Sequence, residues 1–220
     1  MSETIRIEEP HLLLVEGTND QHFLEALIRK LSVDPVQVVR VFGKNNYSGI
    51  LQTLVMAPNF KSTVRRLGVI RDNDNDPDAA FKSIKSALEK NGLPCPKHPE
   101  AFTAGKPPIV GVFLIPGRGK EGCLEDLCLS TRRDHPTMAC VEKFMVCVGD
   151  RMNTEAPDAP ADDKAYGYPK NETKARAHAF LASMPESDKT VGIAAEEGYW
   201  KMDHPVLKDL SKFLRTLTTR

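Results

Sequence analysis

The feature that most constrains the fold is the alternation of short apolar runs with helical patterns over the first 115 residues. Four runs are typical of strands buried on both faces of a sheet: residues 11–15, 36–42, 67–70 and 109–115. Three intervening segments repeat apolar residues at helical spacing: 18–31, 46–56 and 77–92. Strands that alternate with helices predict a mostly parallel sheet with right-handed crossovers. We therefore expect an α/β fold with helices flanking a central sheet.

The second half of the chain has a different pattern. A glycine-rich turn at 117–122 leads into a short predicted helix over 121–129, and residues 141–148 fit either helix or strand. Residues 151–170 are polar and rich in Pro, Asp and Ala, which predicts a long loop. Helical patterns return at 172–183 and 205–217. We expect an α/β domain over 1–130 and a loop-rich, helical extension over 131–220 that packs on the same domain.

Composition excludes some classes of function. Thirty basic and thirty acidic residues give a formal net charge of zero, so no overall positive charge indicates nucleic-acid binding, although local patches remain possible. The five cysteines include no Cys-x-x-Cys pair and predict reduced thiols without a zinc site. No apolar run approaches the length of a membrane span, and the N-terminus is acidic. We expect a cytoplasmic protein with no membrane partner.

Acidic residues follow three of the predicted strands. Glu16 and Asp20 come after the first strand, Asp72 and Asp74 after the third, and Glu125 after the fourth. Ligands of parallel sheets bind beyond the carboxyl ends of the strands, so these side chains are expected to meet there. Clustered carboxylates repel each other unless a cation neutralises them, and hard oxygen ligands favour Mg²⁺ or Mn²⁺.

Two of these segments carry a resemblance to a known family. LLLVEGTND (12–20) and LGVIRDND (67–74) resemble the two acidic motifs of the TOPRIM family, the catalytic domain shared by topoisomerases, bacterial primases and several nucleases. GCLEDL (122–127) is similar to the additional acidic motif of the OLD-type (overcoming lysogenization defect) TOPRIM nucleases. The resemblance covers roughly residues 10–130 and implies a Rossmann-like TOPRIM fold. Asp76-Pro77 stands where the family often has a glycine.

The resemblance implies roles for the acidic residues. Glu16 would be a metal ligand or general base, and Asp72 and Asp74 would hold Mg²⁺ or Mn²⁺ with support from Asp20. Glu125 would help to bind a second ion. Two ions of this kind stabilise the attacking and leaving oxygens of a displacement at phosphorus.

A lysine near the end of the domain accompanies the acidic residues in OLD-type nucleases. Lys174 is our candidate for neutralising charge on the phosphate, and Lys120 competes with it. Family members that join strands or change topology use a zinc module or further domains, for which this chain has neither a zinc motif nor room. The predicted reaction is therefore the hydrolysis of DNA or RNA by water. The resemblance also implies a separate ATPase partner, since no Walker motif is present.

Basic residues that could contact a nucleic-acid backbone are scattered along the chain. Such contacts are salt-dependent and carry no sequence information. The candidates are Lys61, Arg65, Arg66, Arg118, Lys120, Arg132 and Arg133.

Other functions remain open from the sequence. Residues 117–122 (GRGKEG) match Gly-x-Gly-x-x-Gly between a strand and a helix, which favours a protein that binds NAD or a similar nucleotide. A TOPRIM-like module that binds or regulates without catalysis is a third possibility. An EF-hand calcium loop beginning at Asp72 is excluded, because Pro77 and Ser83 occupy the positions of its glycine and bidentate glutamate.

Overall fold

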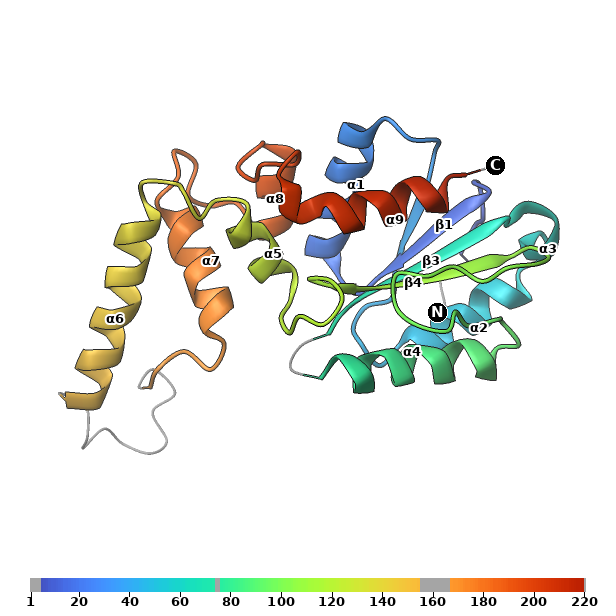
Figure 1. The fold of residues 1–220 in the computed structure, drawn as a ribbon, viewed down its shortest axis with the longest axis horizontal. Helices are drawn as coiled ribbons and strands as arrows, with labels where there is room; N and C mark the ends of the chain where they lie inside the picture. Colours follow the sequence, from blue (N-terminus) through green and yellow to red (C-terminus); the bar gives the residue numbers. More distant parts are fainter. Residues whose placement is uncertain (1–4, 74–75, 155–166, 220) are drawn as a thin grey trace.

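The computed structural model describes residues 5–73, 76–154 and 167–219. Its centre is a four-stranded parallel sheet in the order β2-β1-β3-β4 (Figure 1). The strands are β1 (His11–Val15), β2 (Gln37–Arg40), β3 (Arg66–Asp72) and β4 (Ile109–Ile115). The predicted α/β fold with a parallel central sheet flanked by helices is confirmed.

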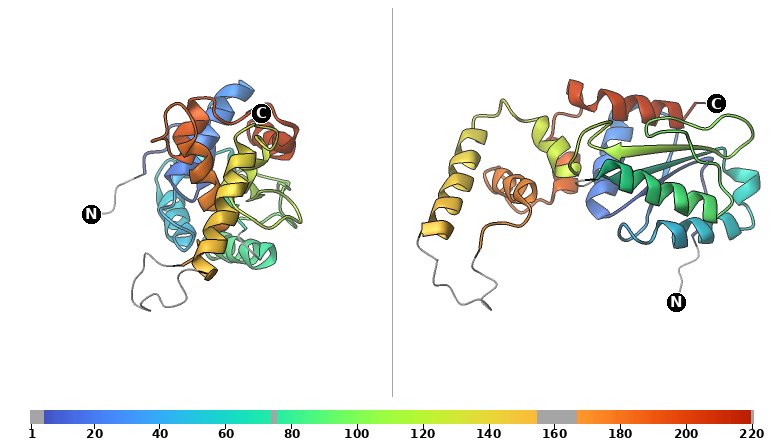
Figure 2. Two further views of the ribbon diagram at one scale, coloured as in Figure 1. Left: turned by 90° about the vertical axis from the view of Figure 1, so that its left-hand side faces the viewer. Right: turned by 60° about the horizontal axis from the view of Figure 1, so that its bottom comes forward.

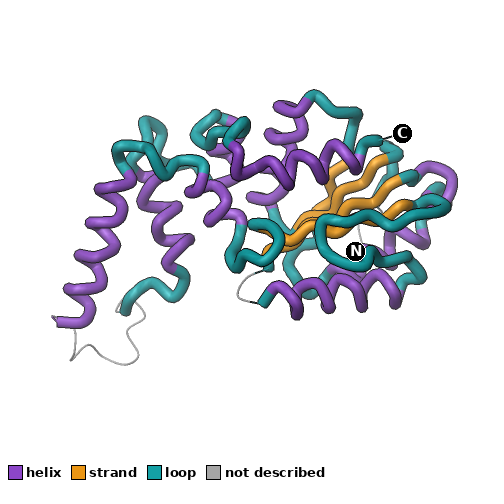
Figure 3. The backbone as a smooth tube through the Cα atoms, viewed as in Figure 1, coloured by secondary structure: helices purple, strands orange, loops and turns teal. Residues whose placement is uncertain are grey.

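Helices cover both faces of the sheet because neighbouring side chains of each strand point to opposite faces. Leu12 and Leu14 of β1 lie in one core with the helices α2 (Tyr47–Met56), α3 (Phe60–Thr63) and α4 (Pro77–Lys90). Leu13 and Val15 lie in the other core, with helices α1 (Thr18–Leu31) and α9 (Lys208–Leu217). Figure 3 shows the strands enclosed between these two helical layers.

The C-terminal helices belong to the second core. Helices α5 (Leu124–Ser130), α7 (Glu172–Ala182) and α8 (Val191–Glu196) contribute buried side chains to it. Trp200 stacks on Phe180 with ring centroids 5.3 Å apart, and its indole N–H donates to the carbonyl of Val191 at 2.9 Å. Trp200 is therefore a packing residue of this core. A 3₁₀ turn, η1 (Pro205–Leu207), leads into α9.

Helices α6 (Met138–Thr154) and α7 lie side by side and project from the sheet (Figures 1 and 2). The segment 141–148, which fitted either structure, is helical. Residues 151–154, which were predicted to be loop, complete α6, and 155–166 lie outside the described residues. Among the helices of the described chain, none has both the length and the apolar character to span a membrane.

Candidate active site

The order of the strands in the sheet creates a crevice at the carboxyl ends of the strands. β1 has β2 on one side and β3 on the other, and in such sheets ligands bind beyond the carboxyl ends, where the connections diverge. A cavity of about 420 Å³ lies there. Five residues predicted from the sequence line this one cavity: Glu16, Asp20, Asp72, Glu125 and Lys174. Asp74, predicted as a further ligand, lies outside the described residues.

Two helices begin at the cavity in the same way. The backbone N–H of Gly17 donates to Asp20 Oδ2 at 2.9 Å at the start of α1, and that of Cys123 donates to Asp126 Oδ2 at 2.9 Å at the start of α5. In both helices the carboxylate of the third helical residue accepts from the backbone N–H of the N-cap residue, which is one half of a capping box. The segments EGTND and GCLED thus bring two helix N-termini to the ends of the strands, where the helix dipole favours negative charge.

Asp72 is held by the start of α5. Its Oδ1 accepts a hydrogen bond from the backbone N–H of Leu124 at 3.1 Å. The possible ligand atoms of Asp72, Cys123 and Glu125 lie within 4.8 Å of one another. Burial and a hydrogen bond with Glu125 raise the pKa of the Cys123 thiol in the absence of a bound cation, and a soft sulfur is a poorer match for Mg²⁺ than carboxylate oxygen. The two carboxylates remain, and they are oxygen ligands suited to Mg²⁺ or Mn²⁺.

Burial and electrostatic repulsion raise the pKa values of two groups at the same cavity. Burial, followed by the negative charge of Glu16, raises the pKa of Asp20 from 3.8 to about 6. Burial together with Glu16 and Asp20 also raises the pKa of Tyr47, whose hydroxyl donates to the carbonyl of Ile70. The donor set therefore fits a divalent cation, because a cation would relieve the repulsion that adds to the effect of burial on these groups.

Lys174 reaches the cavity from the far end of the sequence. Asn171 caps α7 by accepting from the Lys174 backbone N–H at 2.8 Å, and Lys174 Nζ lies 4.0 Å from Glu125 Oε1. The Thr173 hydroxyl donates to Asp126 Oδ1 at 2.8 Å and ties α7 to α5. These contacts hold the start of α7 so that the half-exposed lysine lies beside a carboxylate that is only 8% exposed.

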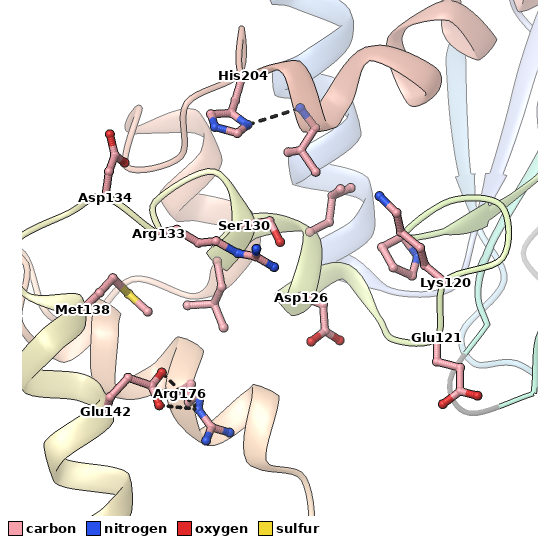
Figure 4. Close-up of a pocket in the computed structure, with 14 residues that line it drawn as sticks. Lys120, Glu121, Asp126, Ser130, Arg133, Asp134, Met138, Glu142, Arg176 and His204 are labelled. Carbon is pink, nitrogen blue, oxygen red and sulfur yellow. Dashed lines mark hydrogen bonds and ion pairs between the residues drawn. The ribbon is translucent and has the colours of Figure 1, made fainter.

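Lys120, the competing lysine, lines a different cavity. This second cavity has a volume of about 790 Å³ and lies beside α5, between the loop after β4 and helices α6 and α7 (Figure 4). Its charged lining includes Arg133, Arg176 and Glu142, and Arg176 Nε donates to the Glu142 carboxylate at 3.2 Å. Of the two predicted lysines, Lys174 is the one that lines the acidic cavity.

Three of the predicted backbone-binding residues lie far from the acidic cavity. Arg66 begins β3 and Asp72 ends it, so the two are separated by roughly 20 Å of extended chain. Lys61 and Arg65 precede Arg66, whose Nε donates to the carbonyl of Thr219 at 2.8 Å. None of these three residues lines the acidic cavity. Arg118 follows β4 at the carboxyl edge, where its backbone N–H donates to Glu100.

Comparison with known proteins places the chain in a family. Residues 10–219 match a family described as "Protein of unknown function (DUF3226)". The chain belongs to the DUF3226 family. No curated protein and no solved structure matches it. The family description names no activity.

The glycine-rich turn has a structural explanation in this DUF3226 member. Gly117, Gly119 and Gly122 all have positive φ, and a Cβ on Gly122 would lie 2.6 Å from Asp126 Oδ2. The first N–H groups of α5 already bind the carboxylates of Asp72 and Asp126. Because a dinucleotide needs such N–H groups for its pyrophosphate, this arrangement disfavours the NAD-binding alternative.

Sequence reasoning missed part of the cavity wall. Arg40 and Phe42, which lie at and after the end of β2, and Thr190, the N-cap of α8, also line it. The carboxyl-edge argument that found the acidic residues applies equally to β2 and would have found Arg40 and Phe42. Thr190 precedes a six-residue helix with little periodic signal, so no sequence pattern indicates it.

Proposed function

We propose that this protein is a Mg²⁺- or Mn²⁺-dependent nuclease of the TOPRIM type, which hydrolyses phosphodiester bonds of DNA or RNA with water. One observation carries the proposal: Glu16, Asp20, Asp72, Glu125 and Lys174 line a single cavity at the carboxyl edge of a parallel sheet. Their sequence positions span 158 residues, from 16 to 174, so local sequence alone does not account for their convergence.

The arrangement of the strands supports the TOPRIM assignment. Glu16 follows β1, and Asp72 ends β3, the neighbouring strand in the sheet. The Glu-Gly-x-x-Asp and Asp-x-Asp motifs therefore meet at one edge, as catalysis by TOPRIM motifs requires. Glu125, from the motif similar to that of OLD-type nucleases, lies in the same cavity. Asp74 is proposed as a further ligand on the motif alone.

The described ligands match the proposed cation. Asp72 and Glu125 offer carboxylate oxygens within 4.8 Å of each other, and Glu16 and Asp20 add negative charge to the same cavity. A divalent cation held there would stabilise negative charge on the phosphate and lower the pKa of water near it.

The side chains of the chain have separate tasks in this proposal. The Leu124 N–H orients Asp72, and burial restricts Glu125, so these ligands are preorganised. Glu16 is a ligand or the general base that removes a proton from the attacking water. Lys174, 4.0 Å from Glu125, neutralises charge that develops on the phosphate oxygens.

The proposed location of the protein is the cytoplasm, and its proposed protein partner is an ATPase. The structure gives all five cysteines as free thiols, which supports a reducing, cytoplasmic location. The OLD-type resemblance supports a separate ATPase partner, which would supply the nucleotide hydrolysis that this chain has no Walker motif to perform.

Metal-dependent cleavage tests the proposal. The purified protein is incubated with single- and double-stranded DNA and RNA in Mg²⁺, Mn²⁺ or EDTA, beside Glu16→Gln, Asp72→Asn and the control Asp78→Asn. Asp78 is an exposed first-turn residue of α4 and undergoes the same chemical change as Asp72. We expect cleavage only with metal, and a loss of at least about 100-fold in Glu16→Gln and Asp72→Asn but not in the control.

Two results would count against a nuclease. Cleavage that persists in EDTA or in both cavity variants would place the activity elsewhere. Metal binding that Asp72→Asn abolishes, without cleavage of any substrate, would favour the non-catalytic binding module.

A further inference from the structure

Phe42 is an exposed aromatic residue at the rim of the acidic cavity. It follows the end of β2, lines the cavity together with Glu16 and Asp72, and is 64% exposed. A ring in this position gains little from packing, because most of its surface stays in water.

The backbone holds Phe42 in an unfavourable conformation. Its φ is 58°, in the left-handed region that bulky residues rarely adopt. The flanking N–H groups fix it there: Val41 donates to the carbonyl of Val15 at 2.9 Å, and Gly43 donates to the carbonyl of Glu16 at 3.0 Å. The Asn46 side chain also donates to the carbonyl of Phe42 at 2.7 Å. Strain that the surrounding structure maintains without a packing gain is characteristic of binding sites.

Arg40 lies against the Phe42 ring at the rim of the acidic cavity. Its guanidinium carbon lies 5.0 Å from the centroid of the Phe42 ring, and its Nη1 donates to the Thr18 hydroxyl at 3.0 Å. Arg40 and Lys174 are the two basic residues among those described around the acidic cavity. Arg40 and Phe42 also line a further cavity of about 750 Å³ along β2, so they form a wall shared by both.

We propose that Phe42 and Arg40 form a nucleotide subsite beside the cleaved bond, with a nucleobase stacked on Phe42 and an adjacent phosphate bound by Arg40. This inference rests on the proposed nuclease function and specifies its substrate as single-stranded nucleic acid. An aromatic ring accepts every base by stacking, and an arginine contacts phosphate without reading sequence. A base in a continuous duplex would first have to leave its stack, which disfavours the duplex.

Abasic substitution tests the subsite. Single-turnover cleavage in Mn²⁺ is measured on a single strand, on the same strand with one abasic nucleotide at each position flanking the cleaved bond, and on the blunt duplex. The proteins are the wild type, Phe42→Leu, which keeps an apolar side chain without the ring, and Phe42→Tyr, which keeps the ring. Phe42 is exposed, so these replacements leave the core intact.

We expect the abasic nucleotide and the Phe42→Leu substitution to lower the cleavage rate by similar factors. At one flanking position the abasic nucleotide lowers the wild-type rate by about 5- to 100-fold, as expected for one stacked base. On the intact strand, Phe42→Leu lowers the cleavage rate by a similar factor. On the abasic strand, the rate of Phe42→Leu falls little further. The variant also cleaves the single strand and the duplex at nearly equal rates. Phe42→Tyr stays near the wild-type rate. Binding is measured by the fluorescence of 2-aminopurine placed at that position of the strand. The Asp72→Asn protein should quench this fluorescence, and the Asp72→Asn/Phe42→Leu protein should not.

The outcomes separate the two proposals. If the wild type cleaves the strand, but Phe42→Leu retains its rate and its sensitivity to the abasic nucleotide, the subsite is wrong and the nuclease stands. If the wild type cleaves neither strand nor duplex, the nuclease and the substrate assignment fall together.

Discussion

Replacement of Asp20 by asparagine should stabilise the protein at neutral pH. Burial and the negative charge of Glu16 raise the pKa of Asp20 from 3.8 to about 6. At 1.36 kcal/mol per pKa unit, this shift corresponds to about 3 kcal/mol of stability lost when Asp20 is ionised in the folded protein. The side chain introduced by Asp20→Asn would carry no charge and would still offer an oxygen to the Gly17 N–H that Asp20 now binds.

The gain should depend on pH in a defined direction. Below pH 3.8 the Asp20 carboxyl is protonated in both states, so its ionisation costs nothing. Between pH 3.8 and about 6 the unfolded state ionises first, and wild-type stability falls as pH rises. The advantage of Asp20→Asn in the free energy of unfolding should therefore rise from near zero at about pH 3.5 to about 3 kcal/mol above about pH 7.

Urea denaturation in EDTA between about pH 3.5 and 8 measures this difference, with Asp78→Asn as an exposed control. Saturating Mg²⁺ should reduce the advantage at about pH 8, because the cation would offset the repulsion in the wild type. A variant that is less stable than the wild type by the same amount at every pH would refute the reasoning. Asp20 would then act only as a helix cap.

Three further predictions concern two residues that line the cavity and the packing of α8 on α1. Lys174→Gln should lower kcat for cleavage by about 100-fold while Mn²⁺ affinity, measured by calorimetry, changes little, because the lysine faces the phosphate charge in our proposal. Phe42→Asn should raise the free energy of unfolding by about 0.5–1 kcal/mol in urea denaturation, since asparagine tolerates a φ of 58° better than phenylalanine. Gly192→Ala should destabilise the protein by about 1–3 kcal/mol in the same assay, because its Cβ would lie 2.7 Å from the backbone oxygen of Asn19 where α8 packs on α1.

The sheet could be predicted from sequence because β1, β3 and β4 are largely buried on both faces. Continuous apolar runs defined β1 and β4 to the residue, and the turn residues after them located the acidic segments. The carboxyl-edge rule then placed Glu16 and Asp72 together. The starts of α1 and α5 give Asp20 and Asp126 a structural role as well, since each accepts a hydrogen bond from the N–H of its N-cap residue.

Other parts depend on tertiary contacts that leave no periodic signal. Within α6, Val141 and Met145 are buried whereas Phe144 and Val146 are exposed, so an amphipathic pattern is weak there. Lys174 reaches the cavity through the contact of Thr173 with Asp126, a pairing of two polar residues 47 positions apart. Lys61, Arg65 and Arg66 were grouped with the site only by charge, and strand direction places them at the opposite edge.

Anomalous diffraction from crystals soaked in MnCl₂ tests the central claim most directly. A cation bound by the acidic cavity predicts one strong peak among Glu16, Asp72 and Glu125, lost in crystals of Asp72→Asn. The second group with suitable ligand atoms, His22, Glu25 and Glu196 between α1 and α8, serves as an internal comparison. A peak at that second group alone, or no peak at the carboxyl edge, would contradict the account.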